Sequence, residues 1–220
     1  MRCTVRLCRG ATHGSYTAVM AFMIDEALLP ATLTSAPMTD EAFAAFCGEH
    51  PDLFFEMTAE GEIIVMPPNY SVTGFQGARI CRQLEAWSEQ DARGVAGDAS
   101  SGFVLPNGAR RSPGACWISH ARIAELAEEE RLRYLHLCPD FVIELKSKTD
   151  RMRVLREKMR EWTGNGARLA WLIDTEAKAV EIYRPGREPE RVENPAVLRG
   201  EGPVEGFVLD LSRIWDPLAR

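Results

Sequence analysis

The stretch CPDFVIELKSK, residues 138–148, constrains the fold most, because it combines a hydrophobic strand face with a charged one. Side chains alternate between the two faces of a strand. One face therefore carries Asp140, Val142, Glu144 and Lys146, and the other carries Phe141, Ile143 and Leu145. The pattern predicts a strand that packs on a hydrophobic core while it presents two carboxylates and an ammonium on its opposite side.

The residues after this strand predict a β-α-β crossover. Asp150 is placed to cap a helix over residues 151–163, in which apolar side chains recur at helical spacing: Met152, Leu155, Met159 and Trp162. The apolar run LAWLID, residues 169–174, predicts the next strand. A connection of this length joins two parallel strands through a helix.

The rest of the chain predicts helices placed between strand pairs. Helices are expected in residues 38–51, with Thr39 or Asp40 as N-cap, in residues 72–90, and after Ser119. Strand pairs are expected around turns at 59–61, 106–108 and 175–177. We therefore expect an α/β fold, a mixed and partly antiparallel sheet flanked by helices. The hairpin at 106–108 and the strands at 140–146 and 169–174 are expected to form the centre of that sheet.

A length of 220 residues suits one domain, which we assign to residues 25–220. We interpret residues 1–24 as a disordered extension, because their arginines and short apolar run only imitate a signal peptide. That run, residues 18–24, is far shorter than the roughly 18 to 20 residues of a membrane-spanning helix. The six cysteines form no C-x-x-C pair, which is typical of reduced thiols. We expect a soluble, cytoplasmic protein with no membrane contact.

Charge restricts how the chain could bind nucleic acid. A net charge of -6 argues against a protein that coats nucleic acid through bulk electrostatics. The best local candidate is RMRVLREKMR, residues 151–160, which carries five basic residues and one acid. The same charges would also suit a solvated helix face, so both interpretations stay open.

Glu144 and Lys146 are the first candidates for chemistry. A carboxylate that holds Mg²⁺ and a lysine that orients water or stabilises phosphate charge suit hydrolysis of a phosphodiester. The Glu-x-Lys pattern alone is common on half-exposed strands. A magnesium site would draw a second carboxylate from a neighbouring strand, and the preceding segment there is RRSPGACWIS.

Four segments in order resemble the Uma2 family of restriction-endonuclease-like proteins. They are MTDEAFAAFCGEHPDLFFEMTAEGEIIVMPP, LPNGARRSPGACWIS, CPDFVIELKSKTDRMRVLREKMREWTGNGARLAWLID and VEIYRPG. The resemblance covers about residues 23–215 and implies a PD-(D/E)XK nuclease fold with a divalent metal between its two central strands. It also implies Mg²⁺, with Mn²⁺ as an alternative, and DNA as the partner. Cleavage of both strands of a duplex with one site per chain would suggest a homodimer.

Carried over by position, the family's Glu-x-Lys falls on Glu144 and Lys146. Its Arg-x-Pro-Asp motif falls on Arg111 to Gly114, so that Gly114 stands where the metal-binding aspartate is expected. The resemblance also places an acidic residue of the 54–66 hairpin near the site, for which Glu56 and Glu62 are candidate metal ligands. Exposed hairpin charges are the alternative for both.

Two further residues complete the list of candidates. Lys158 matches a lysine that recurs in the family's helix and could face metal or phosphate, although a plain surface lysine fits as well. Asp140 shares the strand face of Glu144 but lies four residues away, roughly 13 Å, which favours a role at the strand entry.

The departure at Gly114 leaves two functions open. The first is a metal-dependent DNA endonuclease that is impaired at this position, or one in which another acid replaces the missing aspartate. The second is a catalytically silent member of the same fold that binds nucleic acid or a protein. A folded domain with neither activity is the remaining alternative.

Overall fold

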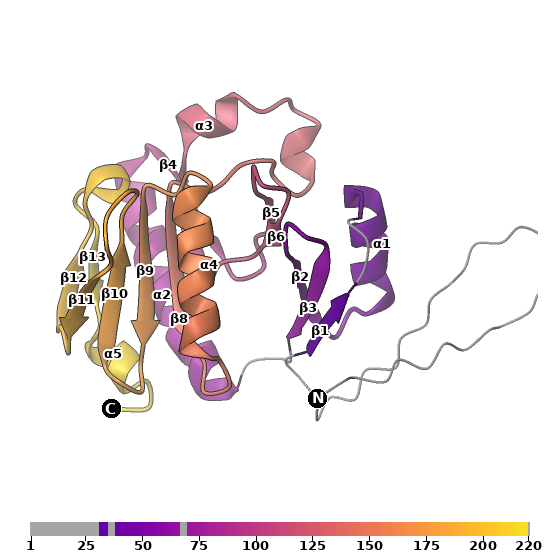
Figure 1. Cartoon of the computed structure of the whole chain (residues 1–220). Coiled ribbons are helices and arrows are strands. Elements are labelled where there is room, and N and C mark those ends of the chain that lie inside the picture. The colour runs from indigo at the N-terminus through magenta and orange to yellow at the C-terminus, as the bar shows by residue number, and fades with distance from the viewer. Residues whose placement is uncertain (1–30, 35–37, 67–69, 220) are drawn as a thin grey trace, which may run out of the picture.

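The computed structural model describes residues 31–34, 38–66 and 70–219 (Figure 1). The predicted N-terminal extension, residues 1–24, lies outside these ranges and stays a prediction. Within them, no helix is both long enough and apolar enough to cross a membrane.

The helices are α1 (Asp40–Glu49), α2 (Ser71–Asp91), α3 (His120–Ala124), α4 (Met152–Gly164) and α5 (Ser212–Trp215), with 3₁₀ turns at Glu130–Leu132 and Gly202–Val204. The first strands are β1 (Ala31–Thr34), β2 (Phe54–Met57), β3 (Glu62–Met66), β4 (Gly94–Asp98), β5 (Phe103–Val104), β6 (Arg110–Arg111) and β7 (Ala115–Ser119). The later strands are β8 (Phe141–Lys146), β9 (Leu169–Asp174), β10 (Ala179–Tyr183), β11 (Glu190–Glu193), β12 (Val197–Arg199) and β13 (Val208–Asp210).

The main sheet has the strand order β11-β10-β9-β8-β7-β4. Its central pair, β8 and β9, is parallel, with Phe141 opposite Leu169 and Lys146 opposite Asp174. The other pairs in this sheet are antiparallel. The predicted crossover through α4 is confirmed, and so is the mixed α/β sheet flanked by helices.

Helices cover both faces of the main sheet, with α4 in front of it and α2 behind it in Figure 1. Phe141 and Ile143 of β8 pack with Ile80 and Leu84 of α2. The side chain of Val142 points the opposite way and belongs to the cluster that contains Leu155 and Met159 of α4. The two strand faces are therefore as predicted, but the charged face is also covered by a helix.

A smaller sheet, of order β1-β3-β2-β6-β5, packs on α1 beside the main sheet (Figure 1). Thr39 caps α1, since its hydroxyl accepts a hydrogen bond from the backbone nitrogen of Ala42 at 3.2 Å. Phe43 and Phe46 of this helix form a core with Met57, Ile63 and Val65 of the hairpin. The predicted helix and hairpin in this region are confirmed.

Two expectations about local structure were wrong. The hairpin at 106–108 belongs to the smaller sheet and not to the main sheet, because Arg110 of β6 pairs with Met57 of β2. The chain then leaves the smaller sheet at Pro113, which has no backbone N–H to donate. The next strand, β7, takes the place beside β8. Asp150 does not cap α4, because its carboxylate accepts a hydrogen bond from the backbone nitrogen of Ser147 at 2.8 Å, and Arg151 is the N-cap residue.

Candidate functional site

Glu144 is buried between the main sheet and α4. It lies on the α4 side of β8, where only 7% of its side chain is exposed. Lys158 and Trp162 reach it from one face of the helix, because residues four apart in a helix lie one above the other. The ammonium of Lys158 is 2.8 Å from its Oε1, and the indole nitrogen of Trp162 donates to the same oxygen at 2.8 Å.

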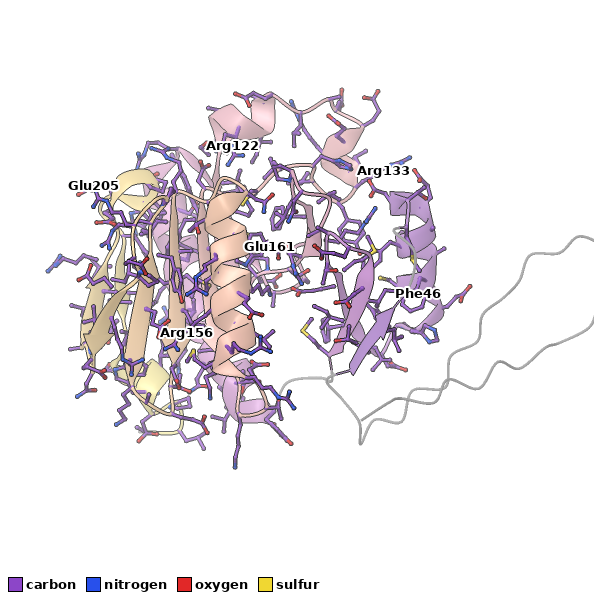
Figure 2. The ribbon with its side chains drawn as sticks, in the orientation of Figure 1. Phe46, Arg122, Arg133, Arg156, Glu161 and Glu205 are labelled. Atoms are coloured by element: carbon purple, nitrogen blue, oxygen red, sulfur yellow. The ribbon has the colours of Figure 1, made fainter. Side chains whose placement is uncertain are left out.

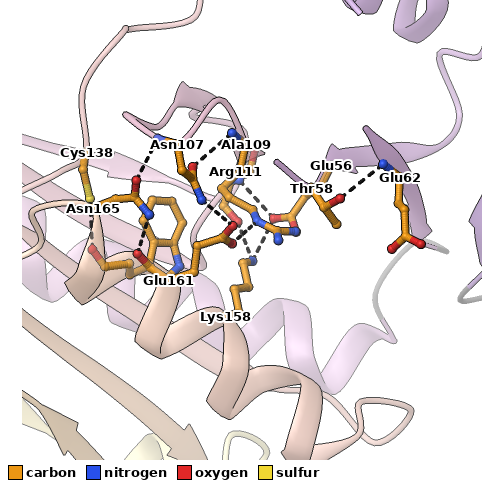
Figure 3. A network of polar contacts seen from close by, with 12 residues as sticks. Glu56, Thr58, Glu62, Asn107, Ala109, Arg111, Cys138, Lys158, Glu161 and Asn165 are labelled. Carbon is orange, nitrogen blue, oxygen red and sulfur yellow. Dashed lines mark hydrogen bonds and ion pairs between the residues drawn. The ribbon is translucent and has the colours of Figure 1, made fainter. Parts of the chain in front are cut away.

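Glu56 brings a second carboxylate to the same place from the smaller sheet (Figure 3). Its side chain is 3% exposed, and its Oε1 lies 2.7 Å from the Lys158 ammonium. The backbone nitrogen of Ser112 donates to that oxygen at 3.0 Å, and the Ser112 carbonyl accepts from Lys158 at 3.0 Å. Four parts of the chain therefore meet at the Lys158 ammonium: strand β2, the segment after β6, strand β8 and helix α4.

Arg111 extends this network toward the outer part of α4. Its guanidinium donates to Oε2 of Glu56 at 3.1 Å and to Oε2 of Glu161 at 2.5 Å. Glu161 lies on the side of α4 that faces the smaller sheet, as Figures 2 and 3 show. We define the site cluster as Glu56, Arg111, Glu144, Lys158 and Glu161.

Burial and charge act differently on the two central carboxyls. Burial raises the pKa of Glu144, because the charged form loses contact with water, and Lys158 offsets only part of this effect. Burial also opposes the charged form of Glu56, but Lys158 and Arg111 outweigh it, so that the pKa of Glu56 is lowered. Burial disfavours the ammonium of Lys158, yet the two carboxylates outweigh it and raise the pKa of Lys158. Glu144 is therefore the carboxyl of the pair that protonates more readily.

The other candidates lie outside this cluster. The ammonium of Lys146 pairs with Glu176 and lies 3.9 Å from Asp174, on the side of the next strand. Glu62 is exposed and points away from Glu56 in Figure 3. The carboxylate of Asp140 accepts from the backbone nitrogen of Ser119 at 3.0 Å and lies 3.5 Å from Arg122, which supports a role at the strand entry.

Sequence reasoning missed the parts played by Trp162 and Glu161, and it treated Arg111 only as the first residue of a motif. A signal was present, because Glu161 and Trp162 follow Lys158 at three and four residues on a predicted helix. Both side chains therefore lie about one helical turn from Lys158.

Comparisons with known proteins agree with this architecture. A family described as "Uma2: Putative restriction endonuclease" matches residues 40–212. The chain belongs to the Uma2 family. One similar solved structure, from Anabaena variabilis, is described as "a putative nuclease belonging to DUF820". It has a TM-score of 0.68 and 18% sequence identity, and the match covers 83% of this chain and 100% of that chain. No curated protein matches the sequence.

Gly114 lies directly beside Glu144. It is the position at which we expected an aspartate from the Uma2 resemblance. Gly114 precedes β7, whose first residue, Ala115, pairs with Ile143. A Cβ atom added to Gly114 would lie 3.8 Å from Cα of Glu144 and 3.0 Å from the carbonyl oxygen of Ile143. A side chain at this position would thus start next to Glu144, and it would crowd the neighbouring backbone.

The donors at the site fit a divalent cation that has two acidic ligands. Glu56 and Glu144 already converge on one positive charge, and Mg²⁺ takes one or two protein carboxylates and fills its other positions with water and phosphate oxygens. Among the residues that the structure describes, no group of three or more acidic, histidine or cysteine side chains could hold a metal. A carboxylate at position 114 would supply such a third ligand.

Proposed function

We propose that this Uma2 protein has a metal-dependent nuclease site for DNA, weakened at the position of Gly114. One observation carries the proposal: the carboxylates of Glu56 and Glu144 converge on the ammonium of Lys158, which helix α4 supplies. Burying two carboxylates beside one ammonium costs free energy, which only good geometry and further hydrogen bonds offset. The family and the related structure are both described as nucleases, which supports this choice of chemistry.

A divalent ion held by Glu56 and Glu144 would supply charge stabilisation for the phosphate and a water molecule with lowered pKa. Lys158 is the cation nearest to both carboxylates and would balance negative charge that develops on the phosphate. Arg111 is a positioning residue, since it holds Glu56 and Glu161 at fixed places around the site. Lys146 would act only after it left Glu176, so we assign the main lysine role to Lys158.

Contact with the DNA backbone would come from the exposed face of α4. Arg153 pairs with Glu157, and Arg156 pairs with Glu181, so these two arginines are partly neutralised. Arg151 and Arg160 are exposed, and the described part of the chain gives neither an ion pair. These two side chains are the better candidates for phosphate contact, and a dimer would be needed to cut both strands at once.

A silent nucleic-acid-binding protein is the second candidate, and the observation in its favour is that Gly114 supplies no third carboxylate next to Glu144. Such a protein would hold DNA equally well with a chelator present and would lose affinity as salt rises. An active site would instead depend on the divalent ion. The two candidates therefore separate on metal dependence.

Nicking of supercoiled plasmid, with Mg²⁺ and then with Mn²⁺, tests the proposal. We expect weak or no cleavage by the unmodified protein, cleavage by Gly114→Asp, and loss of that cleavage when Glu144→Gln is added. Lys158→Ala and Lys146→Ala in the Gly114→Asp background compare the two lysines, and the first should be the more damaging. A Gly114→Asp protein that binds the ion yet leaves DNA and RNA uncut would contradict the nuclease assignment.

A further inference from the structure

The three hydrogens of the Lys158 ammonium all have acceptors. They are matched by Oε1 of Glu56 at 2.7 Å, Oε1 of Glu144 at 2.8 Å and the Ser112 carbonyl at 3.0 Å. An ammonium has three donors and no acceptor, so this set satisfies it completely. The side chain is 12% exposed, and its charge also lies 6.0 Å from the centre of the Trp162 ring. Lys158 is therefore held at one place by partners from several elements.

The carboxylate oxygens around Lys158 are largely committed as well. Oε1 of Glu56 also accepts from Ser112, Oε2 of Glu56 accepts from Arg111, and Oε1 of Glu144 also accepts from Trp162. A divalent ion that binds both acids would have to lie where their oxygens converge. The Lys158 ammonium already occupies that place.

We propose that Lys158 is an internal counter-ion, which must leave the space between Glu56 and Glu144 before a divalent ion can bind both carboxylates. This inference rests on the proposed function, and it adds a contact by which the chain inhibits its own metal site. The apparent affinity for the metal falls by the fraction of molecules in which the site is free of the lysine. Once displaced, the lysine stays tethered to α4 beside the site, where an incoming phosphate would attract it.

Mn²⁺ binding, measured by calorimetry without DNA, tests this competition. Lys158→Met keeps most of the length of the side chain and removes its charge. Arg153→Met is the matched control, because it removes one positive charge from the same helix at a side chain that is 79% exposed. We expect Lys158→Met to bind Mn²⁺ at least about tenfold more tightly than the unmodified protein, and Arg153→Met to bind it unchanged.

Thermal unfolding with and without Mn²⁺ covers the case in which Lys158→Met folds poorly. Removal of the ammonium leaves buried Glu144 without a cationic partner and Glu56 with Arg111 alone, which should lower the melting temperature in chelator. A ligand that binds only the folded state restores stability, so Mn²⁺ should raise the melting temperature of Lys158→Met more than that of either other protein. If Lys158→Met gains neither affinity nor melting temperature from Mn²⁺, the counter-ion proposal is overturned.

Neither measurement involves DNA, so this inference and the nuclease proposal fail separately. Tight Mn²⁺ binding by Lys158→Met, together with no cleavage by Gly114→Asp, would sustain the counter-ion and remove the nuclease. Cleavage by Gly114→Asp with no gain in metal affinity on removal of Lys158 would do the reverse.

Discussion

At the scale of single residues, the site is a balance between burial and charge. Glu56 and Glu144 lie within hydrogen-bonding distance of the same ammonium, but their pKa values move in opposite directions. Burial and the charge of Glu56 raise the pKa of Glu144, whereas Lys158 and Arg111 together outweigh burial and lower the pKa of Glu56. A buried carboxylate without such support favours its neutral form. We therefore expect Glu56 to contribute more than Glu144 to the free energy of unfolding at neutral pH.

Glu56→Gln should lower the free energy of unfolding by about 3 kcal/mol at pH 7, because it leaves two buried cations less well paired. The folded pKa of Glu56 is lowered from 4.5, so its contribution is complete above that value and is lost as pH falls through the lowered pKa. The stability difference between the two proteins should therefore narrow below about pH 4.

Urea unfolding at a series of pH values checks this prediction. Glu62→Gln is the matched control, because Glu62 lies in the same hairpin but is exposed. It should change stability by no more than about 0.5 kcal/mol at any pH. A gap between Glu56→Gln and the unmodified protein that stays constant with pH would contradict the proposed ion pair.

At the scale of elements, α4 determines the geometry of the site. Its inner face places Met159 and Trp162 in the core while Lys158 and Glu161 face the smaller sheet. The helical spacing of the apolar residues predicted this inner face from sequence. Which of the basic residues would be buried could not be predicted, because that depends on a hairpin far away in the chain.

Met159→Ala should lower the free energy of unfolding by about 3 kcal/mol, since Met159 is 0% exposed and the substitution leaves a cavity. The same change at Val154, which is 45% exposed on this helix, should cost no more than about 0.5 kcal/mol. Chemical denaturation of both variants checks the prediction. Equal losses would show that α4 does not pack on the sheet as described.

At the scale of the whole molecule, the site joins two sheets. The smaller sheet supplies Glu56 and Arg111, and the main sheet with its helix supplies Glu144 and Lys158. The sequence predicted the strands that carry Glu56 and Glu144 and the face on which Glu144 lies. It did not predict that the 106–108 hairpin would leave the main sheet, because turn chemistry defines a hairpin but not its neighbours.

The position of Lys146 shows a similar limit. The sequence placed its side chain on the same face as Glu144, and this placement together with the Glu-x-Lys motif of the Uma2 resemblance made it a candidate. The partner strand decides its contacts, since β9 puts Asp174 directly opposite Lys146 and the turn after it supplies Glu176. The register between two strands is a property of the folded molecule, and the local pattern of one strand does not contain it.

We propose that a metal site lies between Glu56, Glu144 and position 114. Its most direct test is calorimetric titration of Gly114→Asp with Mn²⁺, with Gly114→Asn as the control. Asp and Asn have the same number of non-hydrogen side-chain atoms and place the same Cβ against the Ile143 carbonyl, so the two variants differ only in carboxylate against amide. We predict at least about tenfold tighter binding by Gly114→Asp, which corresponds to about 1.4 kcal/mol. Equal affinity of the two variants would contradict the claim.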